Sequence, residues 1–192
     1  MQRLLLIRNR LKAWLGDERA VAAVEFALVL PLLLALYLGS VEASRLYTAD
    51  RKVSTLASSM ADLVSRQKGV IKLSTLNDYF TAATTVMRPL STTGLGQVVS
   101  LVQINSSGTA TVKWSQASGQ GANREVDSPF PLAASARINQ LARGASGWLI
   151  AAEVFYSYEP MLGYIIRDAV QLRHTEYFLP RFEEEITLDR NS

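Results

Sequence analysis

Apolar residues dominate one continuous stretch of the chain, residues 21–41. This stretch contains one charged residue, Glu25, near its start and one proline, Pro31, in its middle. About 20 apolar residues are enough to cross a bilayer as a helix, so the stretch predicts a single membrane span. A charge inside a span costs roughly 2.5–3.5 kcal/mol on insertion scales. Glu25 therefore needs either a partner or a functional reason.

After residue 41 the apolar pattern changes from continuous to periodic. Apolar side chains recur every three or four residues, which places them on one helical face. No glycine or proline follows until Gly69, so we expect the span to continue as one helix to about Lys68. At about 1.5 Å per residue, a helix over residues 21–68 is roughly 70 Å long. Its second half needs a surface for its apolar stripe, which consists of Leu46, Ala49, Val53, Leu56, Met60 and Leu63.

The rest of the chain alternates between helical and extended patterns. A second helix is predicted over residues 74–87, with Ser74 as its N-cap. A glycine-, serine- and proline-rich loop follows at 117–131, and a short helix at 132–142. Four strands are predicted, at residues 97–104, 109–115, 148–159 and 169–178.

The strand order contains no regular helical crossovers, which favours an antiparallel sheet. The predicted fold class is α+β, with a long transmembrane-plus-amphipathic helix packed on a small antiparallel sheet. Between the last two strands, residues 161–166 (MLGYII) form an apolar loop. Contact with a partner and packing into the core are about equally consistent with that loop.

The net charge of +3 lies ahead of the apolar stretch. Residues 1–20 contain five basic and two acidic side chains, which leaves 15 of each sign in the remainder. Positive charge flanking a first span biases that end to the cytoplasm. We interpret residues 1–20 as a cytoplasmic basic leader, with an amphipathic helix on the inner leaflet as the alternative. Residues 42–182 then form a domain beyond the membrane, and residues 183–192 a charged tail.

Signals for catalysis or ligand binding are weak. The chain has no cysteine, and its one histidine, His174, is expected to be structural. Ser65 and Lys68 match an S-x-x-K pattern, but the companion motifs of the penicillin-binding enzymes are absent. Residues 183–185 are three adjacent glutamates, typical of a solvated tail. A neutral domain also argues against nucleic-acid binding. We therefore predict no enzyme activity, metal, cofactor or small-molecule substrate.

The residues around the start of the span form a recognisable pattern. A basic leader ends at a small residue, Ala20, and is followed by an apolar helix with Glu25 at the fifth position after the junction and then Phe26. This resembles the class III signal of type IV pilins, in which glycine normally stands where Ala20 does. The longer string AVEFALVLPLLL, ahead of a domain of this size, resembles the TadE-like family. These are pseudopilins, or minor pilins, of bacterial tight-adherence (Flp, type IVb) pilus systems, and the resemblance covers roughly residues 17–47.

The resemblance implies a pilin-like fold and a role for the span in assembly. A prepilin peptidase would cut between Ala20 and Val21 and free an α-amino group at the membrane edge. Glu25 and the adjacent Phe26 would then mediate subunit pairing, with the carboxylate facing that amine on a neighbouring copy. Pro31 would loosen the helix. Ordinary alternatives are a glutamate near the headgroups and a simple transmembrane kink.

The implied protein is a single-pass component of the bacterial inner membrane, with a cytoplasmic N-terminus and a periplasmic domain. Its partners would be other pilins, pseudopilins and pilus assembly proteins, in a machine for adhesion, biofilm formation or secretion. A different reading places an ordinary signal-peptidase site after Ala43 and releases a periplasmic binding domain. Against this reading, the apolar run exceeds the usual 7–15 residues of a signal peptide.

Overall fold

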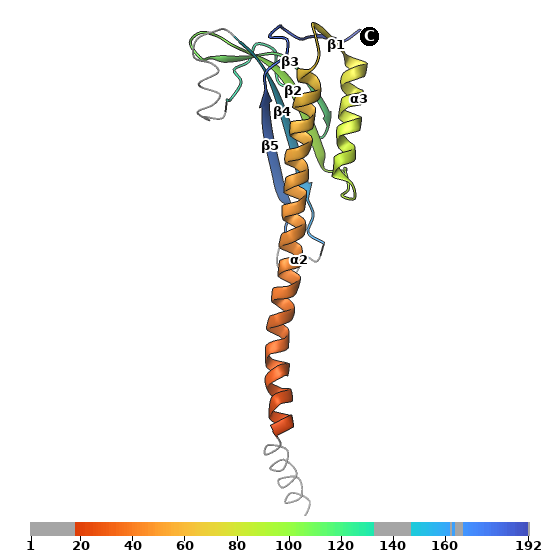
Figure 1. The fold of residues 1–192 in the computed structure, drawn as a ribbon, viewed down its shortest axis with the longest axis vertical. Coiled ribbons are helices and arrows are strands. Elements are labelled where there is room, and N and C mark those ends of the chain that lie inside the picture. Colours follow the sequence, from red (N-terminus) through yellow and green to blue (C-terminus); the bar gives the residue numbers. More distant parts are fainter. Residues whose placement is uncertain (1–17, 133–146, 162, 164–166, 192) are drawn as a thin grey trace, which may run out of the picture.

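A single long helix, α2 (Glu18–Ser65), forms the axis of the molecule (Figure 1). The structure is a computed structural model that describes residues 18–132, 147–161, 163 and 167–191. The predicted continuous helix is confirmed, and it passes through Pro31 without interruption. It ends at Ser65 rather than Lys68, where the Arg181 backbone N–H donates to the Ser65 carbonyl at 2.9 Å. Gly69 follows at φ 67°, in the left-handed region that glycine adopts readily.

The second helical segment packs beside α2 at the far end of the domain (Figure 1). It consists of α3 (Leu73–Thr84) and a short 3-10 helix, η1 (Thr85–Met87). The prediction of a helix over residues 74–87 is confirmed, but Ser74 as its N-cap is wrong. The N-cap is Lys72, without a side-chain capping bond, because a short strand leads directly into the helix. Its buried side chains are Leu76, Phe80, Ala83 and Met87.

The main sheet has four antiparallel strands in the order β3-β2-β4-β5. All four predicted strands are present, which confirms the α+β class. Strand β3 runs to Gly119, so the first residues of the predicted loop at 117–131 belong to the strand. The predicted helix at 132–142 falls almost entirely outside the described residues, as does most of the loop at 161–166. The strands are β2 (Leu95–Ile104), β3 (Ala110–Gly119), β4 (Gly147–Tyr158) and β5 (Val170–Phe178).

A second, two-stranded sheet closes the end of the domain that is farthest from the exposed part of α2 (Figure 1). Its strands, β1 (Val70–Lys72) and β6 (Thr187–Asp189), pair in parallel. The residue before β6, Ile186, is buried, and its carbonyl accepts a hydrogen bond from Trp114 Nε1. Part of the charged tail is therefore tied to the domain, which the sequence pattern did not predict.

The core lies between the second half of α2, α3 and one face of the main sheet. The predicted inward face of β4, from Trp148 to Tyr158, contributes six side chains to this core. The apolar stripe of α2 is confirmed apart from its last residue. Val64 is fully buried there, whereas Leu63 is half-buried. The fully buried side chains of α2 are Ala49, Val53, Leu56, Ala57, Met60, Ala61 and Val64.

The packing predicts that the same substitution is costly in the docked half of α2 and nearly neutral in the exposed half. Leu56 is fully buried and Leu36 is 63% exposed. We expect Leu56→Ala to lower the free energy of unfolding by roughly 2–5 kcal/mol, the usual cost of a buried leucine truncation. Leu36→Ala should leave it unchanged within about 0.5 kcal/mol. Urea unfolding of the full chain in detergent, followed by tryptophan fluorescence, measures both. Equal losses would contradict the packing.

Candidate functional site

The first half of α2 extends away from the domain as an isolated helical segment, which is apolar and exposed (Figure 1). Every residue from 21 to 37 is exposed, and Leu28 and Phe26 are 75% and 61% exposed. An 18-residue window of this helix has a mean hydropathy of 2.4, and none of it is buried. Soluble proteins rarely expose apolar surface on this scale. The helix is long and apolar enough to cross a membrane, and its exposure distinguishes it from an ordinary core helix.

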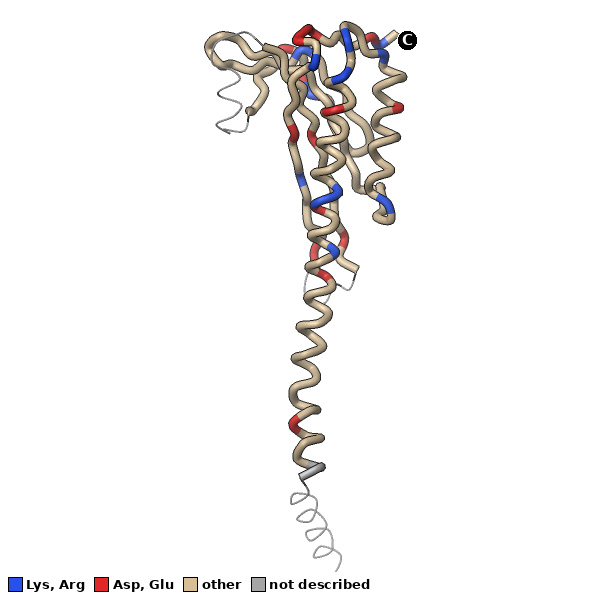
Figure 2. Tube along the Cα trace, viewed as in Figure 1, with Lys and Arg blue, Asp and Glu red and all other residues tan. Residues whose placement is uncertain are grey.

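The residues that sequence analysis assigned to processing and pairing all lie on this segment. Glu25 is the one acidic or basic residue between positions 21 and 41 (Figure 2). Within the described part of the chain it forms no hydrogen bond or ion pair. Phe26 and Pro31 are likewise exposed, and Val21 is 45% exposed. The structure therefore presents these residues outward along the helix and does not gather them into a pocket. Their predicted roles in processing and pairing stay predictions.

Polar contacts tie the second half of α2 to the domain. Lys52 Nζ donates to the carbonyls of Val86 and Arg88, at 2.9 and 2.8 Å. His174 on β5 meets Asp50, with 2.7 Å between Nε2 and Oδ1, which gives the histidine the structural role expected of it. The first contact ties η1 to α2, and the second fixes the position of β5 along the helix.

The S-x-x-K pattern does not form a catalytic pair. Ser65 is buried, and its hydroxyl donates to the Asp62 carbonyl at 2.7 Å. The ammonium of Lys68 lies over the ring of Phe182, 5.6 Å from its centroid. The hydroxyl of Ser65 thus donates its hydrogen bond within its own helix. No cluster of His, Cys, Asp or Glu suited to a metal ion occurs among the described residues.

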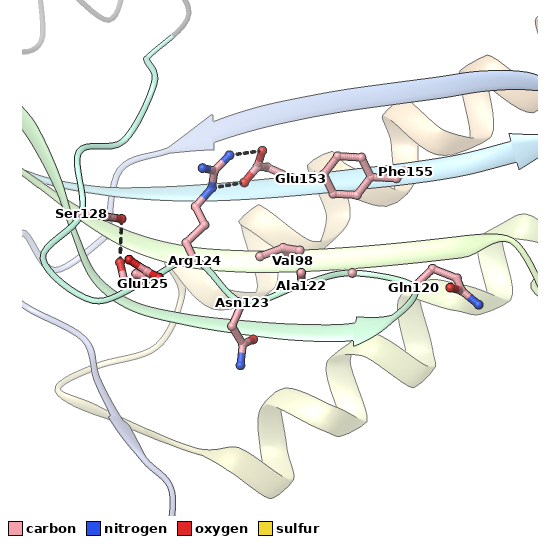
Figure 3. Close-up of a pocket in the computed structure, with 10 residues that line it drawn as sticks. Val98, Gln120, Ala122, Asn123, Arg124, Glu125, Ser128, Glu153 and Phe155 are labelled. Atoms are coloured by element: carbon pink, nitrogen blue, oxygen red, sulfur yellow. Dashed lines mark hydrogen bonds and ion pairs between the residues drawn. The ribbon is translucent and has the colours of Figure 1, made fainter.

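A hollow on the sheet face opposite α2 holds a charged network that sequence analysis did not identify (Figure 3). Glu153 on β4 is only 2% exposed. Its carboxylate accepts two hydrogen bonds from Arg124, at 2.6 and 2.7 Å, and one from Arg173 at 2.8 Å. The one feature of the sequence that could have indicated this network is a glutamate, Glu153, within a largely apolar strand.

The loop that carries Arg124 is held closely against the sheet. A Cβ on Gly121 would lie 2.5 Å from the Gln97 carbonyl oxygen, so only glycine permits this approach. The two guanidinium groups also lie over aromatic rings, Arg124 over Phe130 at 4.6 Å and Arg173 over Phe155 at 4.8 Å. The buried carboxylate of Glu153 is thus fully paired, which indicates a tie between loop and sheet rather than a reactive centre.

Two opposing effects set the pKa of Glu153. Burial alone would raise it, but the hydrogen bonds from Arg124 and Arg173 outweigh burial and lower the pKa below its ordinary value of about 4.5. At neutral pH the carboxylate is therefore ionised and paired.

Comparison with known proteins gives one finding, and it falls on α2. Residues 20–62 match the family model described as TadE-like protein. The match covers the exposed half of the helix and most of the docked half, and it confirms the TadE-like resemblance identified from the sequence. The matched segment is less than a quarter of the chain, so the similarity to this family applies to α2. No curated protein matches the chain, and no solved structure does.

The Glu153 network predicts an acid-sensitive contribution to stability. Because its folded-state pKa is lowered, this contribution is complete above about pH 4.5 and is lost as the pH falls through the folded-state value. We expect Glu153→Gln to lower the free energy of unfolding at pH 7 by about 1–3 kcal/mol and to flatten its decline in acid. Asp127→Asn, in the exposed pair with Lys113, is the control and should change it by less than about 1 kcal/mol. Urea titrations between pH 3 and 7 test both.

Proposed function

We propose that this protein is a membrane-anchored, TadE-like pseudopilin that acts as a structural or assembly component of a tight-adherence type IVb pilus or a related secretion machine. The observation that carries the proposal is the division of α2 into two halves. One half is apolar and bare, and the other forms part of the core of an α+β domain. The family match falls on this same helix.

The proposed topology follows from the charge distribution. The basic residues 1–20 would stay in the cytoplasm, and the exposed half of α2 would cross the inner membrane. The domain that begins near Glu42 would lie in the periplasm. Residues 21–41 correspond to about 30 Å of helix, which equals the thickness of the hydrocarbon core.

We further propose that Glu25 mediates pairing between copies. Val21 and Glu25 are four residues apart, on the same helical face and about 6 Å apart along the axis. Removal of the leader would create a new α-amine at Val21. If two neighbouring copies are shifted by about 6 Å along the helix axis, this amine of one copy lies beside Glu25 of the other. Pairing would offset the cost of a carboxylate in the bilayer. It would also set a stagger between neighbouring helices.

The alternative is a domain released by cleavage after Ala43. The boundary of burial gives this alternative some support, because Glu42 is the first buried residue of α2 and the core residues start at Ala49. Such a cut would remove the bare half and leave the docked half in place.

N-terminal sequencing of the mature protein separates these possibilities. We expect the first residue to be Val21, which requires a peptidase that accepts Ala20 at the cleavage site. A start at Ser44 would establish the released domain and refute the pilin-like reading. An intact Met1 would leave a plain membrane anchor without an α-amine to pair with Glu25.

Substitution of Glu25 tests the pairing. We expect Glu25→Ala to stay in the membrane, because loss of the charge makes insertion easier. We expect its co-purification with other pilus components to fall about tenfold, equivalent to about 1.4 kcal/mol. Asp78→Ala, which removes an exposed carboxylate on α3, is the matched control. Undiminished co-purification of Glu25→Ala would refute the pairing.

A further inference from the structure

A cavity of about 300 Å³ opens where α2 enters the domain. The helix contributes Arg45 and Lys52 to its wall. Its lining also includes Leu90, Tyr158 at the end of β4, and two residues that follow this strand, Glu159 and Met161. Met161 is 66% exposed, so an apolar side chain stands at this end of the domain without cover.

The cavity lies at the level expected for lipid headgroups. When residues 21–41 fill a hydrocarbon core about 30 Å thick, Arg45 stands about 6 Å beyond its outer boundary. The headgroup layer extends roughly 5–7 Å on each side of the core. Arg45 is also the first cationic residue after the apolar stretch (Figure 2). In that placement Arg45 lies at the height of the layer that contains the lipid phosphates.

Neither cation of this cavity forms a salt bridge with a carboxylate of the described residues, although Glu159 also lines the cavity. Among the described residues, the hydrogen bond of the Arg45 guanidinium goes to the sulfur of Met161, a weak acceptor. Lys52 donates to two neutral carbonyls, those of Val86 and Arg88. A guanidinium presents five N–H donors in a planar fork that suits phosphate oxygens. The cavity therefore offers an anion site in which the stronger ligand is unused.

We propose that this cavity binds the phosphodiester headgroup of a bilayer phospholipid, with Arg45 as the phosphate ligand and Leu90 and Met161 against the glycerol and upper acyl chain. Lys52 adds positive potential deeper in the cavity. Glu159 favours a headgroup that carries an ammonium, such as phosphatidylethanolamine, over one with additional negative charge. The proposal rests on the membrane anchoring proposed above. A bound lipid would fix the height of the domain and its rotation about α2 relative to the membrane.

Native mass spectrometry of the full chain in detergent, with phosphatidylethanolamine added, tests the proposal. The bare half of α2 binds acyl chains in every variant, so the comparison is between variants. We expect Arg45→Ala to retain about fivefold less lipid than the unsubstituted chain. Arg51→Ala is the matched control, because Arg51 lies on the same helix but contacts Tyr47. Equal retention by the two variants would overturn the proposal.

Two further measurements identify what is bound. Diacylglycerol has the same chains without the phosphodiester, and we expect Arg45→Ala not to change its retention. A fivefold loss there as well would mean that the site recognises apolar groups, against the proposal. Millimolar inorganic phosphate should not displace the lipid, and displacement would reassign the cavity to a free anion. Equal thermal midpoints of the two variants in lipid-free detergent confirm that both are folded.

Failure of the proposed function has a different signature. If the chain is not a membrane protein, carbonate extraction of cells releases the unsubstituted chain and both arginine variants alike. If only the headgroup site is wrong, all three remain in the membrane fraction and retain equal lipid.

Discussion

The packing of the second half of α2 against the sheet is the interaction on which the rest of the structure depends. Three of the fully buried positions of this half are alanines, Ala49, Ala57 and Ala61, which let the helix approach the strands closely. Because α2 is continuous from Glu18 to Ser65, this packing also sets the direction in which the bare half leaves the domain. Burial of apolar area, at roughly 25 cal/mol per Å², accounts for the docking, whereas the bare half has no such partner within the described chain.

The polar contacts around this packing determine where α2 lies along the sheet, and they add little to the free energy of unfolding. His174 with Asp50 and Arg181 with Asp62 connect α2 to β5 and to the C-terminal segment, at 2.7 and 3.0 Å. Each pair is at least partly exposed, and such pairs contribute about 0–1 kcal/mol. Their geometry nevertheless favours one alignment of the helix along the sheet. On the opposite face of the sheet, the Glu153 network holds the loop that carries Arg124 against β4, and burial makes the loss of this network more costly.

Sequence analysis identified the elements whose side chains repeat with a clear period. The long helix, the second helix and all four main strands follow from this pattern, as does the inward face of β4. Strands β1 and β6 were missed because each has three residues, and their pairing joins positions more than 100 residues apart. The Arg124–Glu153 contact was also missed, because no local pattern shows which arginine reaches a buried carboxylate. Of the candidate site, the sequence identified the exposed apolar segment and Glu25, but not the cavity beside Arg45.

The two edges of the main sheet constrain how copies of this chain assemble in one membrane. The edge of β3 is occupied by backbone bonds from residues 127–130 and by Arg190, which donates to the Ser115 carbonyl. Among the described strands, β5 pairs with β4 alone, and it runs in the same direction as α2 (Figure 1). Antiparallel pairing of two β5 edges about a two-fold axis would therefore invert one α2 relative to the other. Copies that insert in the same direction cannot use that arrangement. The exposed apolar face of α2, on which Glu25 lies, stays available for the pairing proposed above.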